Sequence, residues 1–475
     1  MTILDAGYWI NDLIQYPVSL NLDRALSKYL FCHCHCHCRC HFIIHRRRKE
    51  SCVHRFYYCI TLFLCALLLT GALAAENWPG WRGPGNDGIS AAGNLPLEWD
   101  RTRNVKWRLP LPGPAPSTPA VWGERIFLTS AEDDDLVLIC VNTAGETLWQ
   151  RRLDNGNQDI RQGESNAAAP SPATDGRHVW TFTGTGMLAC HDVDGKEIWK
   201  SDLQKVYGRF NMYWGMSTTP LLDGDRLYLQ LLHSDAQWVL ALDKSSGQEI
   251  WRHRRKTDAR SESLHSYASP VIYRHGGLEL LLIHGADYIT AHRLNDGSEI
   301  WRSGGLQKVG HYNDFLRFVA TPVVSPGLIV VPSAKNGPVL GINPQGAAGD
   351  ITGKSAFFHW QRPDNTTDVP SPLILDGLVY ICRENGVLIC LDALSGEEIY
   401  QERVYNRRHR GSPVYADGKI FLTAMDGTIS LVKPGRQFQL LAQNALEERM
   451  AASPAIAGNT IYLRTHEALY AIGSE

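Results

Sequence analysis

A proline that follows Ser or Thr and precedes a short apolar run recurs at nearly regular spacing through most of this chain. The successive spacings are 53, 48, 50, 52, 50, 41 and 41 residues, which gives eight units in about 400 residues. A period of this length is typical of repeat architectures, in which each unit is one small group of elements that needs its neighbours to bury an apolar face. The eight anchors are Pro119, Pro172, Pro220, Pro270, Pro322, Pro372, Pro413 and Pro454.

Each unit contains short runs of alternating apolar residues separated by turns that contain Gly. One such run, Leu227-Tyr228-Leu229, follows the turn Asp223-Gly224-Asp225, and Val379-Tyr380-Ile381 occupies the same place in a later unit. Period-two apolarity between Gly turns is a strand signature. Four such strands per unit, repeated eight times, predict an all-β fold, an eight-bladed β-propeller of four-stranded blades over residues 104–475.

The last unit ends at Ala471-Ile472, before a fourth strand can form. The segment Asn104–Arg108, around Trp107, has the pattern of a fourth strand without a unit of its own. We therefore predict that this N-terminal strand closes blade eight, because closure removes two exposed sheet edges. Deletion of residues 76–110 is then expected to unfold the whole propeller.

The turn between the third and fourth strands of a unit carries the sharpest motif. Its fullest form runs from Ala241 through Asp243 and Gly247 to Trp251. The Asp side chain can accept hydrogen bonds from amides across the turn, and Gly accepts a positive φ. The Trp supplies a large apolar plate, suited to the gap between neighbouring blades.

Residues 1–75 differ from the rest of the chain and hold eight of the twelve Cys. A basic stretch at 46–49, an apolar run over 57–69 and Ala72-Leu73-Ala74 indicate a secretory signal peptide at 53–75, cleaved near Ala74 or Ala75. A membrane anchor is the alternative, but the apolar run is short for a span. Residues 1–52 are interpreted as an over-extended gene start or a discarded segment, and 76–103 as an N-terminal lead-in.

The expected location is therefore the periplasm or the exterior. The alternating Cys/His run at 32–41 lacks the spacing of a zinc site and is assigned to the discarded segment, with metal binding as the alternative. The formal net charge of −2 excludes a strongly basic nucleic-acid binder, so no nucleic-acid partner is expected. We expect a monomer without a transmembrane segment in the mature chain.

The Ala-x-Asp-x-x-Ser-Gly-x-x-x-Trp motif, repeated around eight blades, resembles the tryptophan-docking motif of the pyrroloquinoline quinone (PQQ) propeller family. The opening Trp78–Pro84 is similar to the lead-in of secreted members. The resemblance implies one of two functions. Quinoprotein dehydrogenases bind PQQ with calcium and oxidise alcohols or sugars, whereas BamB-like members are non-enzymatic scaffolds of the outer-membrane assembly machinery.

Several features depart from both branches. The chain has neither the adjacent Cys pair nor the CxxCH haem motif found among the dehydrogenases, and it lacks the lipobox of a BamB-type lipoprotein. The Cys residues after position 75 are expected to be small buried side chains, because equivalent positions in different blades lie too far apart to bridge. They are Cys140, Cys190, Cys382 and Cys390.

Long loops before the first strands of the middle blades predict a functional rim on one face. For PQQ binding, the candidates are Trp214 for stacking, Arg317 and Arg410 for carboxylates, and Asn211, with Asp314 as a weak candidate base. The alternative for each residue is an ordinary solvated loop. The remaining rim candidates, for a partner or ligand, are Tyr213, His265, Tyr267, His311, Tyr312, Asn313, Arg407, Arg408 and His409.

No sequence motif of a hydrolase, a zinc protease or a nucleotide-binding site is present. We therefore predict a non-catalytic binding or scaffold module that recognises an envelope protein, another envelope component or a small ligand on the long-loop face. The alternative is a PQQ-dependent dehydrogenase with calcium in the channel. No catalytic or metal-binding residue is assigned by motif.

Overall fold

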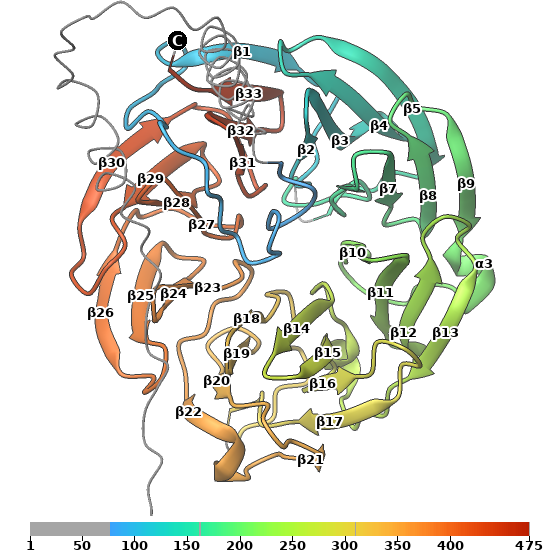
Figure 1. The fold of residues 1–475 in the computed structure, drawn as a ribbon, viewed down its shortest axis with the longest axis vertical. Coiled ribbons are helices and arrows are strands. Elements are labelled where there is room, and N and C mark those ends of the chain that lie inside the picture. The colour runs from blue at the N-terminus through green and yellow to red at the C-terminus, as the bar shows by residue number, and fades with distance from the viewer. Residues whose placement is uncertain (1–76, 161–162, 309, 475) are drawn as a thin grey trace, which may run out of the picture. The chain divides into compact units, whose positions relative to one another are not determined.

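The computed structural model describes residues 77–160, 163–308 and 310–474, which form eight small β-sheets arranged in a ring (Figure 1). Each sheet contains one blade of four antiparallel strands, and one sheet has a short fifth strand that pairs parallel, which confirms the predicted eight-bladed β-propeller. The discarded segment, the Cys/His run and the signal peptide all lie outside the described residues. No helix among the described residues is long and apolar enough to cross a membrane.

The first four blades follow one another along the chain. Blade 1 holds β2 (Ala120–Trp122), β3 (Arg125–Glu132), β4 (Asp135–Asn142) and β5 (Thr147–Asn155). Blade 2 holds β6 (Ala173–Thr174), β7 (His178–Phe182), β8 (Met187–Asp192) and β9 (Glu197–Asp202), followed by the short helix α3 (Leu203–Tyr207). Blade 3 holds β10 (Leu221–Asp223), β11 (Arg226–His233), β12 (Ala236–Asp243) and β13 (Glu249–Arg254). Blade 4 holds β14 (Val271–His275), β15 (Leu278–Gly285), β16 (Tyr288–His292) and β17 (Glu299–Ser303).

The other four blades complete the ring. Blade 5 holds β18 (Val323–Ser325), β19 (Leu328–Pro332), β20 (Val339–Ile342) and β22 (Phe358–Arg362), and its insert β21 (Gly349–Asp350) pairs with β17 of blade 4. Blade 6 holds β23 (Leu373–Leu375), β24 (Leu378–Cys382), β25 (Val387–Asp392) and β26 (Glu398–Arg403). Blade 7 holds β27 (Val414–Ala416), β28 (Lys419–Thr423), β29 (Thr428–Val432) and β30 (Leu440–Ala445). Blade 8 holds β31 (Ala455–Ala457), β32 (Thr460–Arg464) and β33 (Ala468–Ile472).

The outer strand of blade 8 comes from the other end of the chain. It is β1 (Val105–Pro110), which pairs antiparallel with β33, so that Trp107 lies opposite Ala471. Without β1, the outer edge of β33 has no partner strand among the described residues.

The apolar core lies between successive blades. One cluster joins Phe182 and Leu188 of blade 2 to Leu229 of blade 3, and similar clusters occupy the following interfaces. The four Cys that follow position 75 are buried and free, as predicted.

The motif tryptophans connect neighbouring blades. Trp251 of blade 3 donates from Nε1 to the carbonyl of Leu294 in the next blade at 3.0 Å, and its ring lies where a Cβ on Gly297 would be. Trp149, Trp199 and Trp360 make the same kind of contact with the following blade. Blade 7 has no tryptophan in this place: Phe438 lies just before β30 and packs against Tyr400 of blade 6, with 5.7 Å between ring centres.

A ring of hydroxyl groups explains why Ser or Thr precedes each repeat proline. The backbone N–H of one blade's residue donates to the hydroxyl of the next blade's residue at 2.9–3.2 Å, and this continues from blade 1 to blade 8. Thr118 closes the circle, since its hydroxyl donates to the carbonyl of Ser453 at 3.4 Å. The hydroxyl ring consists of Thr118, Ser171, Thr219, Ser269, Thr321, Ser371, Ser412 and Ser453.

The lead-in crosses the ring at one end of the central channel and is drawn in blue in Figure 1. Trp78 forms an antiparallel bridge with Val121 of blade 1. Farther along, Ser90 donates its backbone N–H to the carbonyl of Tyr415 in blade 7 at 2.9 Å. Between these two contacts, buried Arg82 donates to the carbonyl of Pro372 at 2.9 Å. The lead-in is therefore tied to blades on both sides of the channel.

Candidate functional site: a charged collar over the central channel

Six successive blades each place one polar side chain at the mouth of the channel. Each side chain comes from the loop that precedes the blade's first strand, three to eight residues before the repeat proline. Each of these loops leads directly into the hydroxyl ring, and the contacts described below bring their side chains together. The six residues are Glu164, Trp214, Glu262, Arg317, Asp368 and Arg410.

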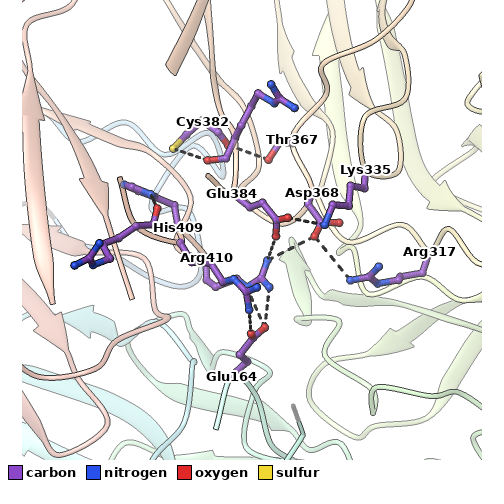
Figure 2. A network of polar contacts seen from close by, with 12 residues as sticks. Glu164, Arg317, Lys335, Thr367, Asp368, Cys382, Glu384, His409 and Arg410 are labelled. Carbon is purple, nitrogen blue, oxygen red and sulfur yellow. Dashed lines mark hydrogen bonds and ion pairs between the residues drawn. The ribbon is translucent and has the colours of Figure 1, made fainter. Parts of the chain in front are cut away.

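Arg410 lies at the centre of a network of ion pairs (Figure 2). Its guanidinium donates to Glu164 at 2.8 and 3.2 Å and to Glu384 at 3.0 Å, and it lies 3.6 Å from Asp368. Glu164 also pairs with Arg408. The loops before blades 2 and 7 are thereby linked across the channel.

The contacts continue around the mouth on the other side. Arg317 lies 3.8 Å from Asp368 and 3.6 Å from Glu262. Glu262 in turn accepts a hydrogen bond from Trp214 Nε1 at 2.7 Å. These residues, together with Lys335, Glu384 and Arg408, form what we call the collar.

The collar carboxylates respond differently to their surroundings. Burial alone would raise the pKa of Glu384, but the ammonium of Lys335, 2.6 Å away, and Arg410 lower it to about 2. Burial raises the pKa of Asp368 against the opposing effect of Arg317. The difference arises because Asp368 is almost fully buried and because the charge of the neighbouring Glu384 carboxylate disfavours a second negative charge beside it.

A cavity of about 190 Å³ lies next to the collar within the ring. Its lining includes the whole hydroxyl ring together with Trp214, Tyr267, Arg317 and Arg410. Trp81 of the lead-in lines this cavity and also a second one near β10, so it stands at the boundary between them.

The structure brings together only some of the predicted cofactor residues. Trp214, Arg317 and Arg410 all line the cavity. Asn211 does not line it: this residue is exposed and donates to Asp235 at 3.1 Å. Asp314 also lies outside the cavity lining, where its backbone carbonyl accepts from Ser263.

The predicted rim residues divide into exposed and buried groups. Tyr213 and Tyr312 are exposed, at 59% and 38%, while His265, Tyr267 and His409 are buried. Burial lowers the pKa of His265 to about 4, which keeps the imidazole neutral at pH 7. His311 is exposed and Asn313 is half-buried beside it.

The basic run of blade 7 is split in the same way. Arg407 faces Asp426 at 3.4 Å and is largely exposed, whereas Arg408 joins the collar. Sequence reasoning singled out Arg410 but not its partners Asp368 and Glu384. Asp368 could have been predicted as a site residue from its position four residues before Pro372, since the other five of the six loop residues lie at similar distances from their prolines. Glu384 lies in a turn between β24 and β25, where nothing in the repeat marks it as functional.

The residues present do not fit PQQ as the sequence resemblance implied. PQQ is a flat polyanion, and Arg317 and Arg410, its expected carboxylate ligands, are already paired with carboxylates of the chain. The collar holds four carboxylates and four cationic groups, so no excess positive charge is left for a polyanion. Among the residues that the structure describes, no three His, Cys, Asp or Glu side chains gather into a possible metal site.

Comparison with known sequences identifies related proteins. The family model described as outer membrane protein assembly factor BamB matches residues 136–381 and 360–473. BamB from Moranella endobia (strain PCIT) is 23% identical over 338 residues, which cover 62% of this chain and 82% of that protein. BamB from Yersinia pestis is 23% identical over 296 residues, which cover 60% of this chain and 68% of that protein.

Solved structures share the fold at low sequence identity. The crystal structure of BamB from Moraxella catarrhalis aligns with a TM-score of 0.56 at 15% identity and covers 77% of this chain and 98% of that one. A europium-containing methanol dehydrogenase aligns with a TM-score of 0.62 at 13% identity and covers 83% and 90%. At such identities the alignments show the fold alone. The family match over most of the blades goes further: this chain belongs to the family described as outer membrane protein assembly factor BamB.

Proposed function

We propose that this chain is a non-catalytic binding scaffold of the cell envelope that docks a protein partner on its long-loop face. The observation that carries the proposal is a group of exposed aromatic side chains on adjacent long loops. Tyr213, Tyr312 and Phe315 are 59%, 38% and 64% exposed. Exposed aromatic residues gathered on one face are typical of protein interfaces, since they supply large apolar area at a low entropic cost.

The loops that carry these aromatic residues are held firmly by one another. The ring of Tyr213 packs edge-on against buried His265 at 4.9 Å between ring centres. Tyr312 accepts a hydrogen bond from the backbone of Arg260 at 3.1 Å, and the Arg260 guanidinium lies over its ring. The aromatic residues are thus presented on a preorganised surface, which lowers the entropic cost of binding.

The family and the collar both support a scaffold over an enzyme. The curated relatives are named outer membrane protein assembly factors, which suggests an envelope protein as partner. In the collar, each acidic group faces a cationic group or an N–H donor, so none is available as an unpaired base or nucleophile. We further propose export to the periplasm, with cleavage near Ala74 or Ala75, which N-terminal sequencing of the cellular protein tests.

Site-specific photo-crosslinking in cells tests the partner surface. A photoreactive residue at Phe315 is expected to form a discrete adduct with one envelope protein, and Phe315→Ser with Tyr213→Ser should remove co-purification of that protein. Leu394 is the matched control, because it is 69% exposed but lies in the turn between β25 and β26. Equal adducts at both positions, or none at Phe315, would rule out this surface.

A further inference from the structure

The central cavity has features that a partner-binding scaffold does not need. Seven members of the hydroxyl ring, from Ser171 to Ser453, accept a backbone N–H but donate to no acceptor among the described residues. A hydroxyl has one proton to donate in addition to its acceptor lone pairs. All seven line the cavity, which therefore offers a circle of unused donors.

The aromatic side chains give the cavity apolar surfaces between these donors. Trp81, Trp214 and Tyr267 all contribute to its lining. The Trp214 indole is oriented by its 2.7 Å hydrogen bond to Glu262, and the Tyr267 hydroxyl accepts from the Trp214 backbone N–H at 3.2 Å. A ligand with apolar faces and polar edges could pack against these aromatic rings and accept hydrogen bonds from the ring hydroxyls.

The collar next to the cavity is balanced in charge and supplies an acceptor. Its four carboxylates and four cationic groups cancel, which disfavours a ligand with a large net charge. Glu164 lines both the cavity and the collar, and its carboxylate oxygens can accept a ligand O–H in addition to their ion pairs with Arg408 and Arg410.

We propose that this cavity binds an uncharged ligand with several hydroxyl groups, either a free monosaccharide or the terminal sugar of a longer glycan. A sugar ring has apolar C–H faces for the aromatic plates and hydroxyl edges that both accept from the ring and donate to the collar. The cavity volume of about 190 Å³ suits one sugar ring, and the adjoining cavity of about 400 Å³ at the collar leaves room for a longer chain. Trp81 of the lead-in lines the cavity at its border with the second one, so the proposed entry is from the collar.

This inference does not rest on the partner surface, and binding to the purified full chain tests it separately. Saturation-transfer NMR with neutral monosaccharides and a glycan array are expected to give saturable binding in the millimolar range or tighter. Binding of monosaccharides would identify a free-sugar site, and binding of oligosaccharides alone would identify a glycan end. Failure of every neutral sugar to saturate, or preference for uronic acids or PQQ, would overturn the proposal.

Variants locate the binding in the cavity. Trp214→Leu is expected to weaken sugar binding at least fivefold, while Trp214→Phe, which keeps an aromatic plate, retains most of it. Trp238→Leu is the matched control, since Trp238 lies in blade 3 between Arg252 and Arg254, away from the cavity. Equal weakening by Trp214→Leu and Trp238→Leu would contradict the assignment.

A measurement on the unmodified protein covers the case in which Trp214→Leu fails to fold. A photoreactive derivative of the bound sugar, followed by peptide mapping, is expected to label the segments that hold Trp214, Arg317 or Arg410. Labelling confined to other segments would place the sugar elsewhere and overturn the proposal.

Discussion

Ser371 shows how one hydroxyl connects two blades. It accepts the buried backbone N–H of Thr321 at 2.9 Å, so Ser371→Ala leaves that donor without a partner. We expect a loss of about 1–3 kcal/mol in the free energy of unfolding, measured by urea denaturation. Ser371→Thr should keep the stability, because Thr118, Thr219 and Thr321 already serve in the same ring. Equal losses for both variants would show that the hydroxyl is not the stabilising group.

The ion pairs of Glu384 should make part of the folding stability sensitive to acid. Its folded pKa is about 2, against an ordinary value of 4.5, because Lys335 and Arg410 outweigh the effect of burial. A lowered carboxyl pKa contributes stability that is present above pH 4.5 and is lost as the pH falls toward 2. Asp368 contributes with the opposite sign, because burial raises its pKa.

Glu384→Gln should therefore lower the melting temperature at pH 7 and flatten its dependence on pH between 4.5 and 2. The control is Glu402→Gln, on the exposed side of β26, which should leave the profile unchanged. A wild-type slope in the Glu384→Gln variant would assign the acid sensitivity to other groups.

Among the structural elements, the turn between the third and fourth strands of a blade contains a glycine that packs against the motif tryptophan of the preceding blade. Gly297 has φ +72°, and a Cβ there would lie 2.4 Å from the Trp251 ring. Gly277 has φ +80° with no atom within 4 Å of an added Cβ. Substitution of Gly277 therefore measures the effect of backbone strain alone, whereas substitution of Gly297 measures backbone strain together with the clash against the tryptophan ring.

Gly277→Ala should cost about 1–2 kcal/mol from the positive φ alone. Gly297→Ala should lower the free energy of unfolding by about 1–3 kcal/mol more than Gly277→Ala, because the Trp251 indole must move. Chemical denaturation of both variants measures the difference, and equal losses would show that the interblade tryptophan contact adds little.

At the scale of the whole molecule, the ring depends on β1. Deletion of residues 77–110 removes the outer strand of blade 8 and also the lead-in that ties Val121 to Tyr415. We expect loss of the single cooperative unfolding transition, with recovery of native tryptophan fluorescence when a peptide of residues 77–110 is added. A deleted chain that still melts cooperatively at the wild-type temperature would show that closure is dispensable.

The repeat made the blades predictable from the sequence, because the signals are local. Period-two apolarity, Gly turns and the spacing of Ser/Thr-Pro are all visible within about fifty residues. The asparagine or aspartate of the turn was also predictable: Asp243 Oδ1 accepts the N–H groups of Ser245 and Ser246 at 3.0 and 2.8 Å. The long-loop candidates Trp214, Arg317 and Arg410 came from position relative to the same repeat.

Local sequence signals were therefore enough to predict the number of blades, their strands and the loops that border the channel. The contact between Glu164 and Arg410, 246 residues apart, and the pairing of the collar cations with carboxylates of the chain are visible only in the folded ring. Pairing across the channel depends on which loops the closed ring brings together, and no spacing along one unit encodes that contact. The same holds for Trp81, which reaches the cavity because the lead-in is bound to distant blades.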